Sequence, residues 1–127
     1  MSGGGAIFCD LGIVQFTFID CDHENIFADF AKFTDPIIRG LKKLGIEAEL
    51  SGRNDLTVGG KKFSGNAQYS QENKTVHHGS ILFSPDMTNL VQALKVRPIK
   101  FQDKAVKSVA GRVTNLKEHL KEPMTVV

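Results

Sequence analysis

Residues 55–69 read DLTVGGKKFSGNAQY, and this stretch decides the fold. Gly59-Gly60 separates two segments that contain β-forming residues. A two-residue hairpin turn of type I′ needs positive φ at both central positions, which glycine adopts without steric cost. The stretch therefore predicts an antiparallel hairpin with strands at 55–58 and 61–69.

Alternation along the second strand assigns its side chains to two faces, because successive residues of a strand point in opposite directions. One face is predicted to hold Lys62, Ser64 and Asn66, and the other Phe63, Gly65 and Ala67. Gly65 and Ala67 leave their face nearly flat, which suits a close approach of backbone or ligand. Lys62 on such a strand is suited to neutralise a carboxylate and a phosphate together. The alternative interpretation makes Lys61 and Lys62 solvent-facing.

The flanking sequence predicts more strands and one long helix. Strands are predicted at 6–8, 14–19, 47–50 and 79–83, and helical spacing of apolar residues runs through 26–44. Pro36 predicts a kink or a break near Asp35, and Gly45 is placed where a helix should end. Strands grouped with a few helices predict the α+β class, with a mixed or antiparallel sheet and helices packed on it.

Two shorter helices are predicted in the second half of the chain. Asp86 is expected to cap a helix through Leu90 and Leu94, and Thr114 to cap a final helix that starts near Asn115.

Length and composition describe an ordinary globular chain of 127 residues, enough for one domain, with a net charge of only +2. This composition indicates no nucleic-acid partner, and no apolar stretch approaches the roughly 20 residues that span a bilayer. Cys9 and Cys21 form no metal-binding spacing and are expected to be free thiols in a reducing compartment. The N-terminus lacks the pattern of a signal peptide, so a cytoplasmic protein is expected.

Basic residues concentrate towards the C-terminus. Residues 95–122 contain eight bases against three acids, and the bases are Lys95, Arg97, Lys100, Lys104, Lys107, Arg112, Lys117 and Lys121. Such a segment can receive an acidic protein or a phosphate-bearing ligand. A solvated lysine-rich face is the alternative interpretation.

Three further segments carry residues suited to ligand binding. Residues 2–12 read SGGGAIFCDLG, whose glycine triplet either lets backbone N–H groups approach an anion or forms a flexible tail. Residues 51–56 read SGRNDL, in which Asn and Asp are typical turn formers, although an Asp beside a phosphate can hold Mg²⁺. His77 and His78 are neighbours at the entrance to a strand and should point to opposite faces, so a shared metal ion is not expected.

Taken together, these segments resemble the lipoate–protein ligase family, within the biotin and lipoyl ligase superfamily. The resemblance rests on SGGGAIFCDLG at 2–12, SGRNDLTV at 51–58, GKKFSGNAQ at 60–68, HHGSILFSPD at 77–86 and SVAGRVTNL at 108–116. It implies the fold of that family's catalytic domain in incomplete form. Residues 1–127 would be one partial domain, without an accessory C-terminal domain.

The resemblance implies a two-step reaction that uses ATP, Mg²⁺ and lipoate as ligands, with no tightly bound cofactor. Lipoate is activated to lipoyl-AMP, and the lipoyl group then passes to a lysine of a lipoyl domain, in a 2-oxoacid dehydrogenase E2 subunit or the glycine-cleavage H protein. Lys62 matches the family's catalytic lysine, and Asp55 is a candidate for Mg²⁺. The adenylate pocket is expected to involve Gly3, Gly4, Gly5, Ala6, Ile7, Phe8, Lys62, His78 and Gly79.

Related activities differ at identifiable positions. Lipoyl and octanoyl transferases of the superfamily use an acyl-carrying cysteine farther along the chain, and no cysteine follows Cys21 here. Biotin ligases carry an arginine in their glycine loop, which SGGGA does not match. The ligase is therefore preferred, and the transferase is kept as an alternative.

The sequence also departs from the family pattern. The family usually has an arginine directly before the Ser-Gly-Gly-Gly loop, and His-Asp and Gly-Asn where this chain has Cys9-Asp10 and Gly12-Ile13. Without the family's N-terminal strands, we expect an exposed sheet edge that permits self-association, and weak or no activity for the chain alone. The alternatives are a relative that binds lipoate, a nucleotide or a lipoyl domain without turnover, and a fragment completed by a separate polypeptide.

Overall fold

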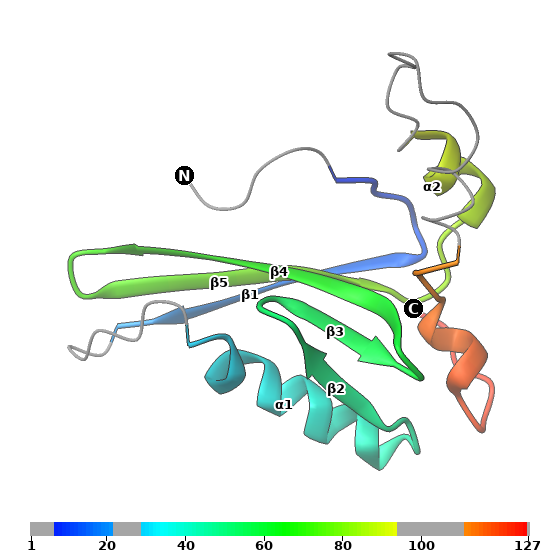
Figure 1. Cartoon of the computed structure of the whole chain (residues 1–127), viewed down its shortest axis with the longest axis horizontal. Coiled ribbons are helices and arrows are strands. Elements are labelled where there is room, and N and C mark those ends of the chain that lie inside the picture. Colours follow the sequence, from blue (N-terminus) through cyan, green and yellow to red (C-terminus); the bar gives the residue numbers. More distant parts are fainter. Residues whose placement is uncertain (1–6, 22–28, 94–110, 127) are drawn as a thin grey trace.

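The protein is built on a five-stranded antiparallel sheet in the order β1-β5-β4-β3-β2. The computed structural model describes residues 7–21, 29–93 and 111–126. The strands are β1 Ile13–Asp20, β2 Ala48–Ser51, β3 Asp55–Val58, β4 Lys61–Gln71 and β5 Lys74–Leu82. The helices are α1 Phe30–Lys43, α2 Met87–Ala93 and a 3-10 helix, η1, Leu116–His119. Figure 1 shows α1 along one face of the sheet, with α2 and η1 near one end, which confirms the predicted α+β class.

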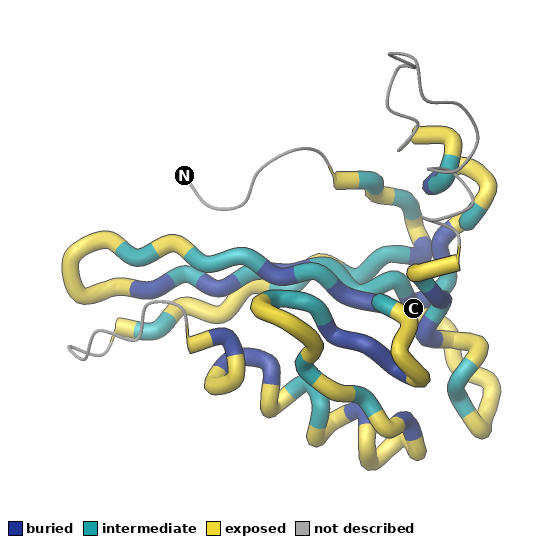
Figure 2. Tube along the Cα trace, viewed as in Figure 1, coloured by how far each residue is buried: buried dark blue, intermediate teal, exposed yellow. Residues whose placement is uncertain are grey.

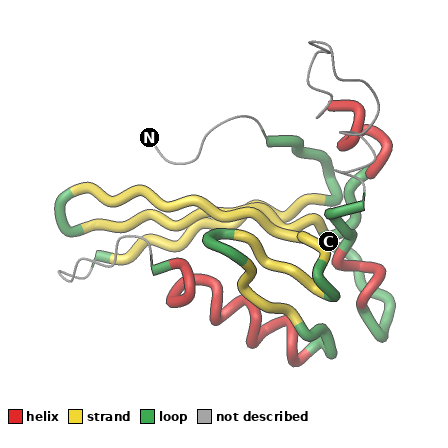
Figure 3. The backbone as a smooth tube through the Cα atoms, in the orientation of Figure 1, coloured by secondary structure: helices red, strands yellow, loops and turns green. Residues whose placement is uncertain are grey.

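Two hairpins form the centre of the sheet (Figure 3). In the first, Gly59 and Gly60 have φ values of 56° and 73°, as the type I′ prediction requires. The second hairpin joins β4 to β5 and turns at Glu72, whose φ of 54° is positive although the residue is not glycine. Because β5 begins at Lys74, before the predicted start, the two adjacent histidines lie within the strand and not at its entrance.

Helix α1 is continuous through Pro36, so of the kink or break expected near Asp35 the break was wrong. Both halves of the helix bury side chains, through Phe30, Phe33, Thr34 and Leu41, and this shared packing offsets the hydrogen bond lost at the proline. Asp29 caps the start by accepting from the Lys32 N–H, and Gly45, at φ 79°, follows the end as predicted. The predicted positions 26–28 lie outside the described residues. No helix in the described ranges is long and apolar enough to cross a membrane.

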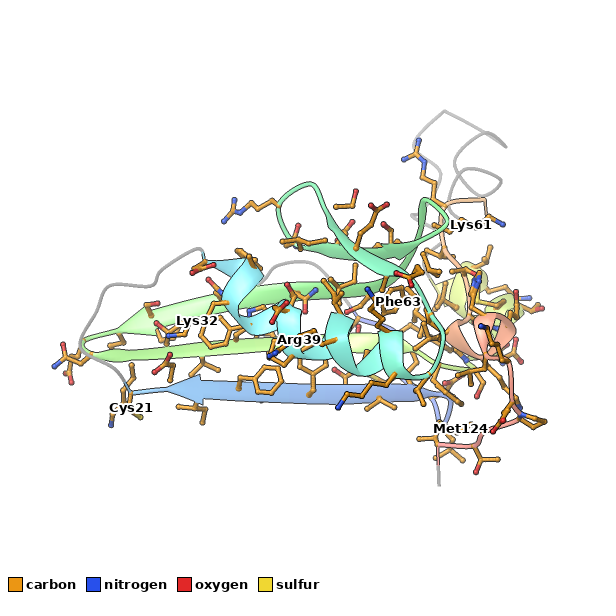
Figure 4. All side chains as sticks on the ribbon, turned by 90° about the horizontal axis from the view of Figure 1, so that it is seen from below. Cys21, Lys32, Arg39, Lys61, Phe63 and Met124 are labelled. Carbon is orange, nitrogen blue, oxygen red and sulfur yellow. The ribbon has the colours of Figure 1, made fainter. Side chains whose placement is uncertain are left out.

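The hydrophobic core lies between α1, the sheet and the C-terminal segment. Its buried members are Leu41, Ile46, Leu56, Val58, Phe63, Phe83 and Leu116. Figure 2 shows this burial in the middle of the sheet and on the inner side of α1, with exposed residues at the β4–β5 turn. Figure 4 views the molecule from the α1 side and shows Phe63 beside the C-terminal half of the helix, where it joins Leu41 in the core.

The ends of the described segments differ from the sequence predictions. Ile7 and Phe8 are irregular, so a strand there was wrong, because no neighbouring strand pairs with them in the described structure. Asp86 caps α2 as predicted, since its carboxylate accepts from the N–H groups of Thr88 and Asn89. Thr114 does not cap η1, because its hydroxyl pairs with His119 Nε2 at 2.9 Å. Leu94, which was placed in the α2 helix, is outside the described residues.

A second buried cluster surrounds His77 between the sheet and α1. The imidazole is fully buried, stacks on Phe33 at 4.9 Å and meets Phe30 edge-on at 5.6 Å. Burial and, to a smaller extent, the charge of His78 lower the pKa of His77 from 6.5 to about 4. His77 thus packs against aromatic rings and hydrogen-bonds to Asn66 and Gln68 in the interior.

Gly79→Ala should destabilise the protein by about 1–3 kcal/mol, through overpacking of a closed position. A Cβ at Gly79 would lie 2.5 Å from Asn66 Oδ1 and 2.6 Å from Phe16 Cζ. The control is Gly40→Ala in α1, where a Cβ meets nothing within 4 Å and should stabilise by about 0.5–1 kcal/mol. Urea unfolding curves measure both changes, and equal stability of the two variants would contradict the packing.

Acid should destabilise the fold through His77. The unfolded histidine takes up a proton near pH 6.5, whereas the folded one resists until about pH 4, so its stabilising contribution is present above pH 6.5 and is lost as the pH falls to about 4. The loss is on the order of 3 kcal/mol. The free energy of unfolding of His77→Gln, measured by urea between pH 7.5 and 4, should fall less than that of the natural chain. Parallel curves would show that His77 is not the cause.

Candidate functional site

A β-bulge positions Lys62. The register pairs Leu56 with Ser64 but Thr57 with Lys62, so Phe63 is an extra residue in β4. Phe63 and Ser64 are both buried, and the alternation of faces shifts at this point. The prediction that Lys62 shares a face with Ser64 and Asn66 was therefore wrong. Its side chain lies with that of Asp55, on the face opposite the core.

Lys62 and Asp55 form an ion pair on this face. Lys62 Nζ lies 2.7 Å from Asp55 Oδ1, and the two side chains are 40% and 35% exposed. Gly65 pairs with Asp55 across the strands, and a Cβ there would lie 3.1 Å from Lys62 Nζ. The glycine thus leaves the space that the ammonium group occupies. The pair is ordered by its partners and is still open to a ligand.

The C-terminal segment holds the backbone of Lys62. The Lys62 N–H donates to Arg112 O at 2.8 Å, and the Thr114 N–H donates to Lys62 O at 2.9 Å, around a parallel bridge between Lys62 and Val113. Lys62 also pairs with Thr57 of β3, and the pairing of β4 with β5 begins only at Ser64, so the segment binds a part of β4 that β5 does not pair with. RVTNL was used only for the family resemblance, and its binding to Lys62 was not predicted. The two β-branched residues Val113 and Thr114 could have indicated an extended segment there.

His78 lies on the same face as the ion pair. It pairs with Ala67, which shares the face of Gly65 two positions away, and with Thr17 of β1. Gly79, the next residue, belongs to the opposite face, where it meets Phe16 below the sheet. The structure therefore brings Lys62 and Asp55 into contact, places His78 on the same face, and places Gly79 on the opposite face.

The glycine loop is described only at its end. Residues Gly3, Gly4, Gly5 and Ala6 lie outside the described residues. Ile7 is 76% exposed and Phe8 is half-buried. The role of these six positions in an adenylate pocket stays a prediction.

Asp10 was missed as a structural residue of this segment. Its Oδ1 accepts from the Gly12 N–H at 2.8 Å, and its Oδ2 accepts from the Asp86 N–H at 2.8 Å. One carboxylate thus ties the chain after the glycine loop to the start of α2. The signal was available in Asp10-Leu11-Gly12, since an Asp that bonds the backbone two residues later forms an Asx turn.

The described ranges contain no group of three or more His, Cys, Asp or Glu side chains placed to hold a metal ion. Among the described residues, Asp55 beside Lys62 could give one carboxylate to a divalent cation, with further oxygens supplied by a ligand. One carboxylate together with substrate phosphates is a usual environment for Mg²⁺. Asp55 fits that role if it is shared with Lys62.

Comparison with known proteins assigns the family. Residues 1–127 match the family described as the lipoyl protein ligase A/B catalytic domain. The chain belongs to this family. The lipoate–protein ligase LplJ of Bacillus subtilis is 46% identical over 98% of the chain, and lipoate–protein ligase 1 of Staphylococcus aureus is 44% identical over 99%. The chain spans 38% of the length of each of these relatives.

Solved structures of lipoate–protein ligases share the fold of this catalytic-domain chain. A bi-partite ligase from Thermoplasma acidophilum, studied with its E2 lipoyl domain, superposes with a TM-score of 0.84 at 29% identity, over 97% of this chain and 49% of that one. LipL1 of P. falciparum, in complex with lipoate, gives a TM-score of 0.75 at 32% identity, over 98% and 33%. A lipoate–protein ligase A bound to ATP gives 0.78 at 25% identity, over 97% and 50%.

Proposed function

We propose that this chain carries the chemistry of a lipoate–protein ligase, with Lys62 as its catalytic residue. The observation that carries the proposal is the half-exposed Lys62 ammonium group beside Asp55, on a face that Gly65 leaves free of side chain. Family membership supports the same activity. Residues 1–127 would then be part of one catalytic domain.

The reaction needs positive charge at the place where Lys62 lies. A carboxylate oxygen of lipoate attacks the α-phosphorus of ATP, the bond to the bridging oxygen breaks, and pyrophosphate leaves with the electron pair. Two anionic groups must approach each other in this step, and a fixed ammonium group lowers their repulsion. Lysine is suited to this because it is a compact charge with three donors. In the second step the amine of the acceptor lysine attacks the acyl carbon, and AMP leaves.

Mg²⁺ would neutralise the phosphates of ATP. Asp55 is the residue of this chain that we propose as its ligand, and its carboxylate would exchange its bond to Lys62 for the cation or share it between the two. Asp55 would thus help to hold the cation, and the Lys62 ammonium group would lie beside it to meet the anionic substrates.

The apolar part of lipoate has a path along the same face. Beyond Gly65 and Ala67, the cross-strand row formed by Ile19, Val76 and Tyr69 presents apolar surface. Ile19 is 66% and Tyr69 37% exposed, so this row can accept an alkyl chain and a dithiolane ring. Phe63 does not contribute to this row, because the bulge turns it into the core.

We propose a lipoyl domain as the acceptor, from an E2 subunit or the glycine-cleavage H protein. The bi-partite relative studied with its E2 lipoyl domain supports this choice. Exposed bases adjoin the end of β4 that carries Lys62, namely Lys61, Arg112 and Lys117, and they suit an acidic partner. Because ATP is a cytosolic co-substrate, we place the reaction in the cytoplasm.

Lys62→Ala should abolish lipoylation, with a loss of at least about 100-fold, because the anionic transition state loses its fixed cation. The purified chain is incubated with ATP, Mg²⁺, lipoate and an apo lipoyl domain, and the mass gain of the acceptor is measured. Lys61→Ala is the matched control, since it removes the exposed neighbouring lysine and should retain activity. Equal activity of the two variants would remove Lys62 from the mechanism.

The alternatives are separated by the same preparation. A folded chain that binds lipoate or a lipoyl-adenylate analogue by calorimetry, without modifying the acceptor, would be a binding relative or would need a separate polypeptide. Modification from an octanoyl or lipoyl donor without ATP would indicate a transferase. Loss of the analogue's affinity in Lys62→Ala would place that binding at the same face.

We also propose that the chain self-associates through the β1 edge. In the described structure β1 pairs only with β5, and a free edge presents unpaired N–H and C=O groups. Ile19→Lys puts a charge on this edge and should lower the mass from sedimentation velocity towards the 13.9 kDa of one chain. Leu11→Lys is the control, because Leu11 is 98% exposed but lies outside the sheet. A single 13.9 kDa species in the natural chain would refute the proposal.

A further inference from the structure

Two asparagines clamp the start of β3 to β4 beside the ion pair. Asn54 Nδ2 donates to Asn66 O at 2.8 Å, and Asn66 Nδ2 donates to Asn54 O at 3.0 Å. The Asn66 N–H donates to the same Asn54 O at 2.9 Å. Asn54 directly precedes Asp55, and Asn66 directly follows Gly65. The clamp therefore lies next to Asp55 in β3 and next to Gly65 in β4, the two residues that surround the Lys62 ammonium group.

The clamp acts where the strand pairing is shortest. On the side of the bulge away from Gly59-Gly60, β3 and β4 share only the pairs Asp55–Gly65 and Leu56–Ser64, and Asp55 also pairs with Ser51 of β2. So short a ladder between β3 and β4 leaves room for a further constraint from side chains. The side-chain bonds of Asn54 and Asn66 add the missing constraint on the carboxylate that holds Lys62.

A buried row of hydrogen bonds fixes the orientation of Asn66. Its Oδ1 lies 3.2 Å from His77 Nε2, and His77 Nδ1 lies 3.0 Å from Gln68 Nε2. Gln68 Nε2 also donates to Asp29 O at 3.1 Å, at the N-terminus of α1. Both ends of the row are backbone carbonyls, Asp29 O and Asn54 O, which can only accept.

These acceptors settle the direction of every bond in the row. Gln68 gives one hydrogen to Asp29 O and the other to His77 Nδ1, so neutral His77 carries its proton on Nε2. That proton goes to Asn66 Oδ1, which leaves Asn66 Nδ2 to donate to Asn54. The bond between His77 and Asn66 is shielded from water, because His77 is fully buried and Asn66 is 5% exposed. Gly79 leaves the room that Asn66 Oδ1 needs.

We infer that Asn66 is a positioning residue of the proposed active site. Asn66 holds Asn54, and Asn54 sets the position of the neighbouring Asp55 carboxylate. That carboxylate in turn sets the position of the Lys62 ammonium group. His77 and Gln68 hold the Asn66 amide in its orientation. The inference deepens the proposed function and rests on it for its catalytic meaning.

The test reads the ion pair directly and needs no enzymatic activity. The full chain is labelled with limiting acetic anhydride, and the modification of Lys62 relative to Lys61 is measured by peptide mass spectrometry. Asn66→Asp keeps the side-chain shape but replaces the Nδ2 donor with a second acceptor. Release of Lys62 from a half-exposed ion pair should raise the Lys62-to-Lys61 ratio about threefold. Asp55→Asn is the positive control, and Asn73→Asp, the same change at the exposed β4–β5 turn, should leave the ratio unchanged.

A purely structural role is distinguished by a second variant. Asn54→Ala, at a half-buried position, removes one bond of the clamp and should raise the ratio less, in a chain that unfolds cooperatively. If Asn66→Asp does not fold, this variant decides alone. The inference is overturned if a folded clamp variant has the same Lys62-to-Lys61 ratio as the natural chain while Asp55→Asn has a raised ratio.

Activity then separates this inference from the proposed function. In a chain that lipoylates, Asn66→Asp should lower kcat for adenylate formation more than it raises KM for lipoate. If Lys62→Ala leaves lipoylation intact, the proposed function fails, and the labelling ratio still decides whether Asn66 positions the pair.

Discussion

The bulge at Phe63 is the constraint on which the arrangement of the site depends. One extra residue in β4 sends Phe63 and Ser64 into the interior together and returns Lys62 to the opposite face. Lys62 stays paired with Thr57 of β3, and the segment around Val113 binds its backbone where β5 no longer pairs with β4. A regular strand would have placed the lysine on the α1 face, where burial without a partner is costly. The site therefore exists because the ladder is imperfect at this point.

The two faces of the sheet have different roles. The face below α1 holds the core and the polar row that includes His77, and its interactions are set by packing. The other face holds the Lys62–Asp55 pair, with small residues beside it and His78 farther along. The sheet is one layer thick, so a hydrogen bond made on one face fixes atoms that are used on the other. This division agrees with the proposed function, since a ligase reaction would need an anion-binding surface on a rigid support.

Sequence reasoning succeeded where the determinant is local. The Gly59-Gly60 turn, the end of α1 at Gly45 and the Asp86 cap each depend on one or two residues and their φ preferences or side-chain bonds. Lys62 and Asp55 were also found, through the resemblance of their segments to the family. Their direct contact was not foreseen, because period-two alternation placed Lys62 on the wrong face.

The remaining features depend on contacts between distant residues. The bulge follows from the burial of Phe63 and from pairing with Val113, which lies far along the chain. The bond between Asn66 and His77 crosses a hairpin whose turn at Glu72 gave no glycine signal. Even the continuity of α1 through Pro36 is a result of packing on the sheet and not of helix propensity. No window of neighbouring residues contains this information.

The brace between Lys62 and Val113 has a consequence for the order in which the molecule assembles. The hairpins β2–β3, β3–β4 and β4–β5 join neighbours along the chain and can close early, because short loops cost little entropy. The pairing of β1 with β5 and the bridge to Val113 close much longer loops and are expected to form late. Asp55, Gly65 and Lys62 belong to an early hairpin, whereas the backbone bonds of Lys62 to Arg112 and Thr114 form only in a late closure. The lysine therefore reaches its final place only when the chain has closed as a whole, so a partly folded chain would hold most of the sheet without a finished site.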